Sequence, residues 1–301
     1  IIAADALIDE ISPDALLLLG DTNSCLSAIP AKRRKIPIFH MEAGNRCFDY
    51  RVPEEINRKI VDHISDINMP YTEHARRYLL SEGIRPETII KTGSPMLEVL
   101  EHYRAQIEDS DVLGRLGLDA GEYFVVSCHR EENVDSPENF SNFLHSLNAI
   151  AAKWNRPIIV STHPRTRKKL DEPGDNLELN KLIRFLKPLG LVDYVSLQTR
   201  AACVISDSGT ITEESSILNF PAVTIRQTHE RPEGMDEGVV IMCGLESDKV
   251  IDAIEMVTAQ FDPINRGFRI VADYDVPNVS KKVARTIAGY VDFVNRTVWH
   301  K

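Results

Sequence analysis

Short apolar runs alternate with amphipathic stretches along most of the chain. Several runs are apolar and β-branched nearly throughout, which is typical of strands buried on both faces of a sheet. They lie at residues 15–20, 36–40, 67–71, 89–93, 123–129, 157–163, 194–197, 203–207, 222–226 and 239–242. Helical patterns separate most of them, at residues 53–65, 73–82, 137–153 and 248–260 among others. This alternation predicts an α/β fold built from βαβ units with parallel sheets.

The length of the chain predicts two lobes, because 301 residues exceed the usual size of one hydrophobic core. The polar stretch 104–122 is the best candidate boundary, since it precedes a new strand at 123–129. We therefore expect an N-terminal Rossmann-like lobe at residues 1–104 and a C-terminal, nucleotide-binding one at 105–277. A final helix within 278–301 is expected to pack back toward the N-terminal lobe.

The first residues are unusual for such a lobe. Residues 1–11 predict a helix that leads into the strand at 15–20, whereas a doubly wound domain normally opens with a strand and a phosphate-binding turn. We expect an opening segment of about two βα units, on the order of 60–70 residues, to be absent from this lobe.

Composition and charge narrow the function classes. With 43% hydrophobic and 27% charged residues the chain is globular, and its longest apolar runs are too short to span a bilayer. A net charge of −10 disfavours nucleic-acid binding. The five cysteines include no CxxC pair, which argues against a disulfide framework or a structural zinc site. Without a GxGxxG turn or a GxxxxGK loop, bound NAD and a P-loop nucleotide site are disfavoured.

Carboxylates follow neighbouring strands of the first lobe, where open α/β sheets place their ligands. Asp21 directly follows one apolar strand, and Glu42 follows the next, ahead of a Gly-Asn-Arg sequence that packing explains poorly. Glu54 opens a helix behind Pro53. A turn cap accounts for Asp21 and an ordinary helix start for Glu54, so structural roles stay open. Together the three carboxylates can meet at one sheet edge, where repulsion and burial hold one of them as a proton donor or acceptor near neutral pH.

The second lobe presents two polar clusters at strand ends. His129 and Arg130 end the strand at 123–129, where His129 is a candidate acid, base or phosphate donor and Arg130 a candidate phosphate ligand. A purely structural histidine is the alternative. The Ser-Gly-Thr sequence at 208–210 joins a buried strand to a helix, and its free N–H groups suit a diphosphate. Glu214 lies about one turn into that helix, within reach of ribose hydroxyls, although a plain helix cap also fits this pattern.

The polar motifs occur along the chain in a specific order, which is Gly20-Asp21-Thr22, His40-Met41-Glu42-Ala43-Gly44, Pro53-Glu54-Glu55-Ile56-Asn57-Arg58, His129-Arg130, Asp207-Ser208-Gly209 and Glu230-Arg231-Pro232-Glu233. As an ordered set they resemble the non-hydrolysing UDP-N-acetylglucosamine 2-epimerases over nearly the whole chain. The resemblance implies a GT-B-like fold, shared with many sugar-nucleotide glycosyltransferases, with the UDP-sugar substrate in the cleft between two lobes. It also implies a homodimer of the bacterial cytoplasm that needs no cofactor and serves surface polysaccharide synthesis.

The family's reaction assigns roles to the site residues. A base removes the C2 proton while UDP leaves C1, and UDP then adds back to the 2-acetamidoglucal as a proton returns to the other face of C2. By resemblance the acid–base group is Asp21, Glu42 and Glu54, with His129 assisting near the diphosphate. Phosphate is assigned to Ser208, Gly209 and Thr210, and the ribose to Glu214. The remaining substrate-binding residues are Arg46, Arg130, Arg231 and Glu233, with no metal.

Departures from the common family pattern point to a branch. Where Leu-Arg usually follows Glu-Ala-Gly, this chain has Asn-Arg-Cys-Phe-Asp at 45–49. With residues 51–63 and 71–80, this stretch resembles relatives that convert UDP-2-acetamido-2,6-dideoxy-L-talose to UDP-N-acetyl-L-fucosamine for capsule or O-antigen. Phe48 or Cys47 is expected to line an apolar pocket for the C6 methyl group, and ordinary core packing is the alternative for both.

Rival functions remain at this stage. The nearest is the 2-epimerase of UDP-N-acetylglucosamine and UDP-N-acetylmannosamine, and from another class a UDP-sugar glycosyltransferase, since the fold alone does not separate them. A third is a chain that binds UDP without chemistry, because the family's Gly-Thr-Arg-Pro-Glu opening loop has no match here.

In the branch that acts on UDP-N-acetylglucosamine, a second substrate molecule activates the enzyme. Residues 161–167 of this chain depart from the pattern of that branch, so we do not expect such activation here.

Overall fold

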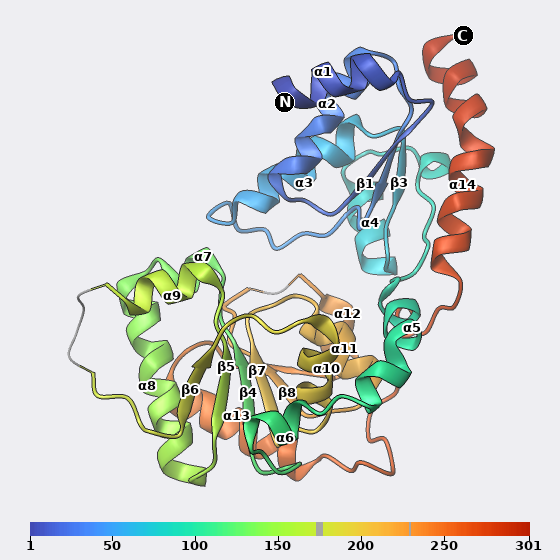
Figure 1. Ribbon diagram of the computed structural model, residues 1–301. Coiled ribbons are helices and arrows are strands. Elements are labelled where there is room, and N and C mark those ends of the chain that lie inside the picture. The colour runs from blue at the N-terminus through green and yellow to red at the C-terminus, as the bar shows by residue number, and fades with distance from the viewer. Residues whose placement is uncertain (173–176, 229) are drawn as a thin grey trace. The chain divides into compact units, whose positions relative to one another are not determined.

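The computed structural model describes residues 1–172, 177–228 and 230–301, which divide into two compact units (Figure 1). Unit 1 comprises Ile1–Glu98 and Ala272–Lys301, and unit 2 comprises Val99–Val271. The division falls inside helix α5 (Met96–Glu108), slightly earlier in the chain than the boundary expected at residue 104. Nowhere in the described part of the chain does a helix have the length and apolarity needed to cross a membrane.

Unit 1 is a three-stranded parallel sheet in the order β1-β2-β3 with helices on both faces. Its strands are β1 (Leu16–Leu19), β2 (Ile38–Met41) and β3 (Ile67–Met69). Its helices are α1 (Ile2–Ile11), the 3-10 helix η1 (Asn23–Ser27), α2 (Ala28–Arg33), α3 (Pro53–Ile64), α4 (Glu73–Ser81), η2 (Pro86–Thr88), α14 (Val279–Val294) and the terminal π-helical turn η3 (Asn295–Trp299). The helices α1, α2 and α3 pack on one face of the sheet and α14 on the other.

Unit 2 is a six-stranded parallel sheet in the order β6-β5-β4-β7-β8-β9. Its strands are β4 (Phe124–Ser127), β5 (Ile158–Ser161), β6 (Ile183–Leu186), β7 (Cys203–Ser206), β8 (Ala222–Thr224) and β9 (Ile241–Met242). Its helices are α6 (Val112–Leu116), α7 (Glu131–Val134), α8 (Pro137–Trp154), α9 (Pro164–Leu170), α10 (Leu191–Thr199), α11 (Ile211–Leu218), α12 (Pro232–Asp236) and α13 (Ser247–Ala259). The chain leaves β4 toward β5 on one side and returns to β7 on the other, so the switch point of this sheet lies between β4 and β7.

The core of unit 2 follows from the alternation of side chains along its central strand. Phe124 and Val126 pack with side chains of α8 and α13, whereas Tyr123 and Val125 pack with side chains of α10 and α11. Strands covered on both faces must be apolar in both directions, which is why β4 reads as a continuous apolar run. Each fully buried aliphatic or aromatic side chain in such a core stabilises the fold by roughly 1.5–3 kcal/mol.

Two of the expected strands are wrong. Residues 194–197 belong to helix α10, which begins after Gly190 with Asp193 in its first turn, while the unexpected strand β6 lies just before it. A short apolar run does not distinguish a strand from a buried helix, and β6 is an edge strand whose mixed burial hides the apolar pattern. Residues 89–93 form only an isolated bridge to β3, through Ile89 and Asn68, before the chain turns at Gly93.

Candidate active site

The carboxyl ends of β1 and β2 bring Asp21 and Glu42 to the same edge of the unit 1 sheet. Leu19 pairs with Met41 in register, and the N–H of Gly20 donates to the carbonyl oxygen of Met41 at 3.2 Å. Gly20 and Glu42 both have positive φ, at +72° and +63°. A Cβ atom on Gly20 would lie 3.2 Å from Oε2 of Glu42, so this carboxylate lies against the backbone that carries Asp21.

Helix α3 supplies the polar partners of Asp21. Nε of the buried Arg58 lies 2.5 Å from Oδ2 of Asp21, and the side-chain amide of Asn57 donates to the Asp21 carbonyl oxygen at 2.9 Å. The guanidinium of Arg58 also lies 3.2 Å from Glu55. Both side chains of this Arg58–Glu55 ion pair are buried. This cation compensates the negative charge gathered at the sheet edge.

The two glutamates at the start of α3 have different surroundings. Glu55 is fully buried and accepts the N–H groups of Cys47 at 3.0 Å and Phe48 at 3.3 Å, so it anchors the loop that precedes the helix. Glu54 is half-buried in the same first turn, behind Pro53 at the first helical position. Glu54 is therefore the less constrained of the two, and its role in proton transfer stays a prediction. The anchoring role of Glu55 depends on tertiary contacts.

A buried ionic network lies beneath this edge. The guanidinium of Arg46 is fully buried, with Nη1 2.7 Å from Asp62 and a two-pronged contact to Glu82 at 2.8 and 2.7 Å. Burial opposes ionisation of Asp62, but hydrogen bonds from His40 and Arg46 outweigh it and hold the pKa of this carboxyl below its usual range. The guanidinium of Arg46 faces the carboxylates of Asp62 and Glu82. Its predicted contact with substrate stays a prediction. Asp62 and Glu82 were not predicted from the sequence, although an Asp among the buried positions of a helix is a usable signal.

The loop at residues 45–50 links Glu42 to α3. Asn45 donates from its amide to Oε1 of Glu42 at 3.2 Å. The Cys47 thiol is buried and lies 3.4 Å from a carboxylate oxygen of Glu55, so its surroundings are polar rather than an apolar pocket. Phe48 is 64% exposed, with its ring edge-on to Tyr78 at 5.3 Å. Of the two residues expected to face a sugar methyl group, Phe48 is the one with accessible apolar surface.

In unit 2 the ends of β4 and β7 meet at the switch point. Asp207 follows β7, is completely buried and accepts the N–H groups of His129 and Arg130, each at 2.9 Å. Its Oδ1 also lies 3.0 Å from Nδ1 of His129, whose side chain is 36% exposed. Burial opposes ionisation of Asp207, but the hydrogen bonds from His129, Arg130 and Asn133 lower the pKa of this carboxyl below its usual value. The aspartate thereby fixes the orientation of the imidazole.

The expected diphosphate turn lies beside this histidine. Ser208 and Thr210 are half-buried, and their hydroxyl oxygens are 3.0 Å apart at the start of α11. A Cβ on Gly209 would lie 3.4 Å from Glu230 and 4.0 Å from Arg130, so the backbone of the turn is close to charged side chains. Arg130 itself lies 3.3 Å from Glu230. The turn therefore combines a helix N-terminus with an adjacent guanidinium, as an anion site requires.

Glu214 lies one turn into α11 and is almost fully buried. The side-chain amide of Gln198, from α10, donates to Oε2 of Glu214 at 2.7 Å. Burial raises the pKa of Glu214 above its ordinary value. Within the described ranges no donor satisfies the buried amide oxygen of Gln198. Among the other predicted residues, Arg231 is 2.8 Å from Glu213, and Glu233 is buried at the start of α12.

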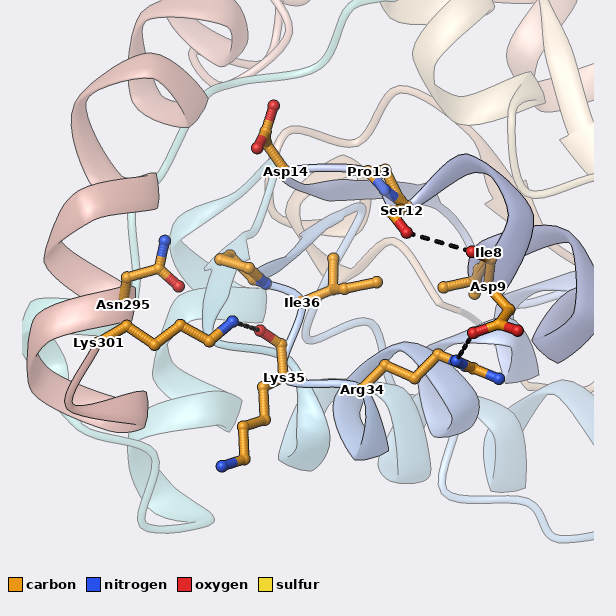
Figure 2. A pocket seen from close by; sticks show the side chains of 11 residues that line it. Ile8, Asp9, Ser12, Pro13, Asp14, Arg34, Lys35, Ile36, Asn295 and Lys301 are labelled. Atoms are coloured by element: carbon orange, nitrogen blue, oxygen red, sulfur yellow. Dashed lines mark hydrogen bonds and ion pairs between the residues drawn. The ribbon is translucent and has the colours of Figure 1, made fainter.

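A separate cavity of about 330 Å³ lies in unit 1 at the opposite edge of the sheet (Figure 2). It is lined by residues that precede β1 and β2, including Ser12, Asp14 and Lys35, and by Asn295 and Lys301 from the end of the chain. None of the predicted catalytic or UDP-binding residues lines it. Ligand sites of open α/β sheets form at the carboxyl ends of the strands, so this cavity is not the candidate active site.

Comparison with known proteins agrees with the expected family and fold. A family model described as UDP-N-acetylglucosamine 2-epimerase matches residues 1–288. A UDP-N-acetylglucosamine 2-epimerase of Methanocaldococcus jannaschii is 36% identical over 252 residues, which are 81% of this chain and 69% of that protein. The structure of a UDP-N-acetylglucosamine 2-epimerase from Rickettsia bellii superimposes with a TM-score of 0.93 at 53% identity, covering 99% of this chain and 79% of the other. The M. jannaschii enzyme in complex with UDP-GlcNAc and UDP superimposes with a TM-score of 0.88 at 32% identity, covering 96% and 79%. The prediction of an α/β fold with parallel sheets in two lobes is thereby confirmed.

Proposed function

Because the chain belongs to the UDP-N-acetylglucosamine 2-epimerase family, we propose that it inverts C2 of UDP-2-acetamido-2,6-dideoxy-L-talose and forms UDP-N-acetyl-L-fucosamine. The enzyme class follows from the family: the chain is an isomerase that epimerises a UDP-linked N-acetylamino sugar without hydrolysing it. The choice of sugar is the proposal. The rival substrate pair is UDP-N-acetylglucosamine and UDP-N-acetylmannosamine.

The chemistry requires carboxylates at C2 and a stabilised leaving group at C1. A base takes the C2 proton, the C1–O bond to UDP breaks, and the electron pair of the C–H bond forms the C1–C2 double bond. In the reverse step UDP oxygen adds to C1 while an acid delivers a proton to the opposite face of C2. We assign proton transfer to Asp21, Glu42 and Glu54. The observation that carries this assignment is the placement of Asp21 and Glu42 at neighbouring strand ends, with Oε2 of Glu42 against Gly20.

Unit 2 is proposed to hold UDP. The Ser-Gly-Thr turn at 208–210 offers backbone N–H groups and hydroxyls to the diphosphate, and Arg130 lies beside it. His129, oriented by Asp207, presents its other ring nitrogen as a donor to the departing phosphate oxygen, where negative charge develops. Glu214 is assigned to the ribose hydroxyls, and Arg231 and Glu233 to the same substrate.

The loop at residues 45–50 supports the 6-deoxy sugar. The side chains of Phe48 and Tyr50 are 64% and 66% exposed on this loop, which Glu55 ties to α3 and Asn45 ties to Glu42. The apolar ring of Phe48, on the loop that follows Glu42, suits a methyl group at C6 and offers no hydrogen bond to a C6 hydroxyl, while the Tyr50 hydroxyl accepts from Lys59 at 2.7 Å. Such a surface discriminates against the hydroxylated sugar by about 10²-fold.

Deuterium exchange tests the activity and the sugar together. The protein is incubated in D₂O with each UDP-sugar and no acceptor, and incorporation at C2 is followed by NMR alongside kcat/KM. We expect C2 deuteration of both epimers of the 6-deoxy sugar, with kcat/KM for that pair exceeding that for UDP-N-acetylglucosamine by about 10²-fold. Faster turnover of UDP-N-acetylglucosamine would exclude the proposed sugar while leaving the enzyme class intact. A requirement for an acceptor, with no C2 deuterium, would instead indicate a glycosyltransferase.

A further inference from the structure

His40 lies in the middle of the unit 1 sheet and is only 1% exposed. It occupies the central strand β2, between β1 and β3, and its ring spans two polar groups from different elements. Nδ1 lies 2.8 Å from Oδ1 of Asp62 on α3, and Nε2 lies 3.0 Å from the carbonyl oxygen of Gly20 after β1. The reaction assigned above gives His40 no role, although a buried polar ring at this position needs an explanation.

The partners of His40 determine its protonation state. A backbone carbonyl only accepts hydrogen bonds, and an ionised carboxylate only accepts them as well. Asp62 is ionised, since its second oxygen accepts from Nη1 of Arg46 at 2.7 Å and from the N–H of Gly44 at 3.1 Å. Both ring nitrogens of His40 must therefore donate, which makes the ring an imidazolium.

The groups around the ring support this charge. Burial disfavours the imidazolium, but hydrogen bonds to Asp62 and Gly20 and the nearby charge of Glu42 raise the pKa of His40 above its usual value. Arg46 reaches the ring only through Asp62, which it keeps ionised. The thiol of Cys25, from η1, has its pKa raised to about 11 by burial and by the charges of Asp21 and Asp62, so it stays neutral.

The same contacts connect the two loops that carry the proton-transfer carboxylates. One end of the His40–Asp62 pair holds the carbonyl of Gly20, which directly precedes Asp21. The other end holds the N–H of Gly44, two residues after Glu42. Gly20 and Glu42 have positive φ, and the Glu42 carboxylate lies against Gly20. Rotation of the Gly20–Asp21 peptide therefore displaces the carboxylates of Asp21 and Glu42 together.

We propose that His40 is a positioning residue for the epimerisation, which as a doubly protonated link from Asp62 to the Gly20 carbonyl holds Asp21 and Glu42 in their relative geometry. The inference rests on the proposed function in so far as these carboxylates transfer the proton. Since misplacement of a reacting group by about 1 Å reduces rates by about 10²-fold, loss of this link should act on kcat. Substrate affinity should change little, because His40 does not contact the residues assigned to UDP.

Two replacements separate the two ends of the link. In His40→Asn the amide nitrogen takes the place of Nδ1, so the contact to Asp62 is kept and that to Gly20 is lost. In His40→Gln the amide nitrogen takes the place of Nε2 and keeps the donor to Gly20. We expect kcat of His40→Asn to fall by about 10–100-fold with unchanged KM and unchanged UDP affinity. We expect kcat of His40→Gln to fall less, because it loses the contact to Asp62 but keeps the donor that directly holds the Gly20 carbonyl. The matched control is His145→Asn on the exposed surface of α8, which should behave as wild type.

Circular dichroism and thermal unfolding establish that the variants fold. Wild-type kcat in folded His40→Asn protein, or equal losses in the Asn and Gln variants, would overturn the proposal. An independent measurement on the unchanged protein is ¹⁵N NMR of labelled histidines at pH 8, where both ring nitrogens of His40 should carry protons. A ring with one unprotonated nitrogen at that pH would equally overturn it. Failure of the wild-type protein to exchange C2 hydrogen would refute the proposed function instead. In that case the NMR experiment still decides whether His40 is doubly protonated between Asp62 and Gly20.

Discussion

Replacement of Gly44 by alanine should destabilise unit 1 strongly, because this glycine is constrained in two ways. Its φ is +82°, a conformation that side chains disfavour, and a Cβ there would lie 2.4 Å from the carbonyl oxygen of Ala75 and 2.9 Å from Cγ of Leu79. The carbonyl belongs to the backbone of α4 and has no freedom to rotate away. The loop behind Glu42 would have to separate from α4, which would also weaken the hydrogen bond from Gly44 to Asp62.

The magnitude follows from comparison with Gly83, which lies just after the same helix. Gly83 has a similar φ of +86°, but a Cβ there would meet nothing within 4 Å. Both Ala variants incur the cost of a left-handed conformation, about 1–2 kcal/mol. Only Gly44→Ala adds steric overlap in a packed region, typically about 1–3 kcal/mol and sometimes more. We therefore expect Gly44→Ala to be less stable than Gly83→Ala by at least about 1 kcal/mol, with a central value near 2.

Tryptophan fluorescence during urea unfolding measures this difference in the correct unit. The chain has two tryptophans, Trp154 in unit 2 and Trp299 in unit 1, so a Trp154→Phe background leaves a signal from unit 1 alone. Both glycine variants are compared in that background, and the slope of the unfolding free energy against urea concentration should be the same for both. If Gly44→Ala and Gly83→Ala lower the free energy of unfolding equally, the inferred steric overlap with α4 is wrong. The left-handed backbone conformation would then account for the whole loss in both variants.

Three further predictions concern the charged groups. Asp21→Asn, Glu42→Gln and Glu54→Gln should each reduce turnover by about 10²–10⁴-fold while UDP affinity, measured by calorimetry, is kept; a variant with near-wild-type turnover removes that residue from the acid–base set. Glu214→Ala should weaken UDP binding by roughly 1–3 kcal/mol, and unchanged affinity in calorimetry would contradict its assignment to the ribose. The folded pKa of Asp207 is lowered, so its contribution to stability is present at neutral pH and is lost as pH falls below about 4. Asp207→Asn should therefore be less stable at pH 7 and show a shallower loss of stability in acid, whereas a parallel acid profile would refute the linkage.

The positions of the site residues can be predicted from the sequence where they directly follow an apolar strand of a parallel sheet. Apolar strands followed at once by Asp21 and Glu42 predict one sheet edge, and the parallel register of β1 and β2 places them there. The strand–Ser-Gly-Thr–helix pattern likewise predicts the turn that begins α11. In both cases the chain direction alone fixes the edge, because every strand of a parallel sheet ends on the same side.

The contacts that hold the site are different in kind. The sequence shows His40 and Arg46 on either side of Glu42, with Asp62 in the following helix, and nothing in their spacing indicates that this buried carboxylate joins the other two. Helix α10 and strand β6 were also missed, since a short apolar run is compatible with either structure until its neighbours are known.

What the sequence determined by itself was the alternation of strands and helices, the family and the polar residues at the strand ends. The tertiary structure alone decided which of those residues are buried in ion pairs and which have accessible side chains. Glu54 and Glu55 show the reason, since adjacent acids in one helical turn differ only in that the loop at 45–50 folds over the second. Hydrophobic period and turn chemistry act within a few residues, whereas desolvation and charge pairing depend on groups that the fold brings together from distant parts of the chain.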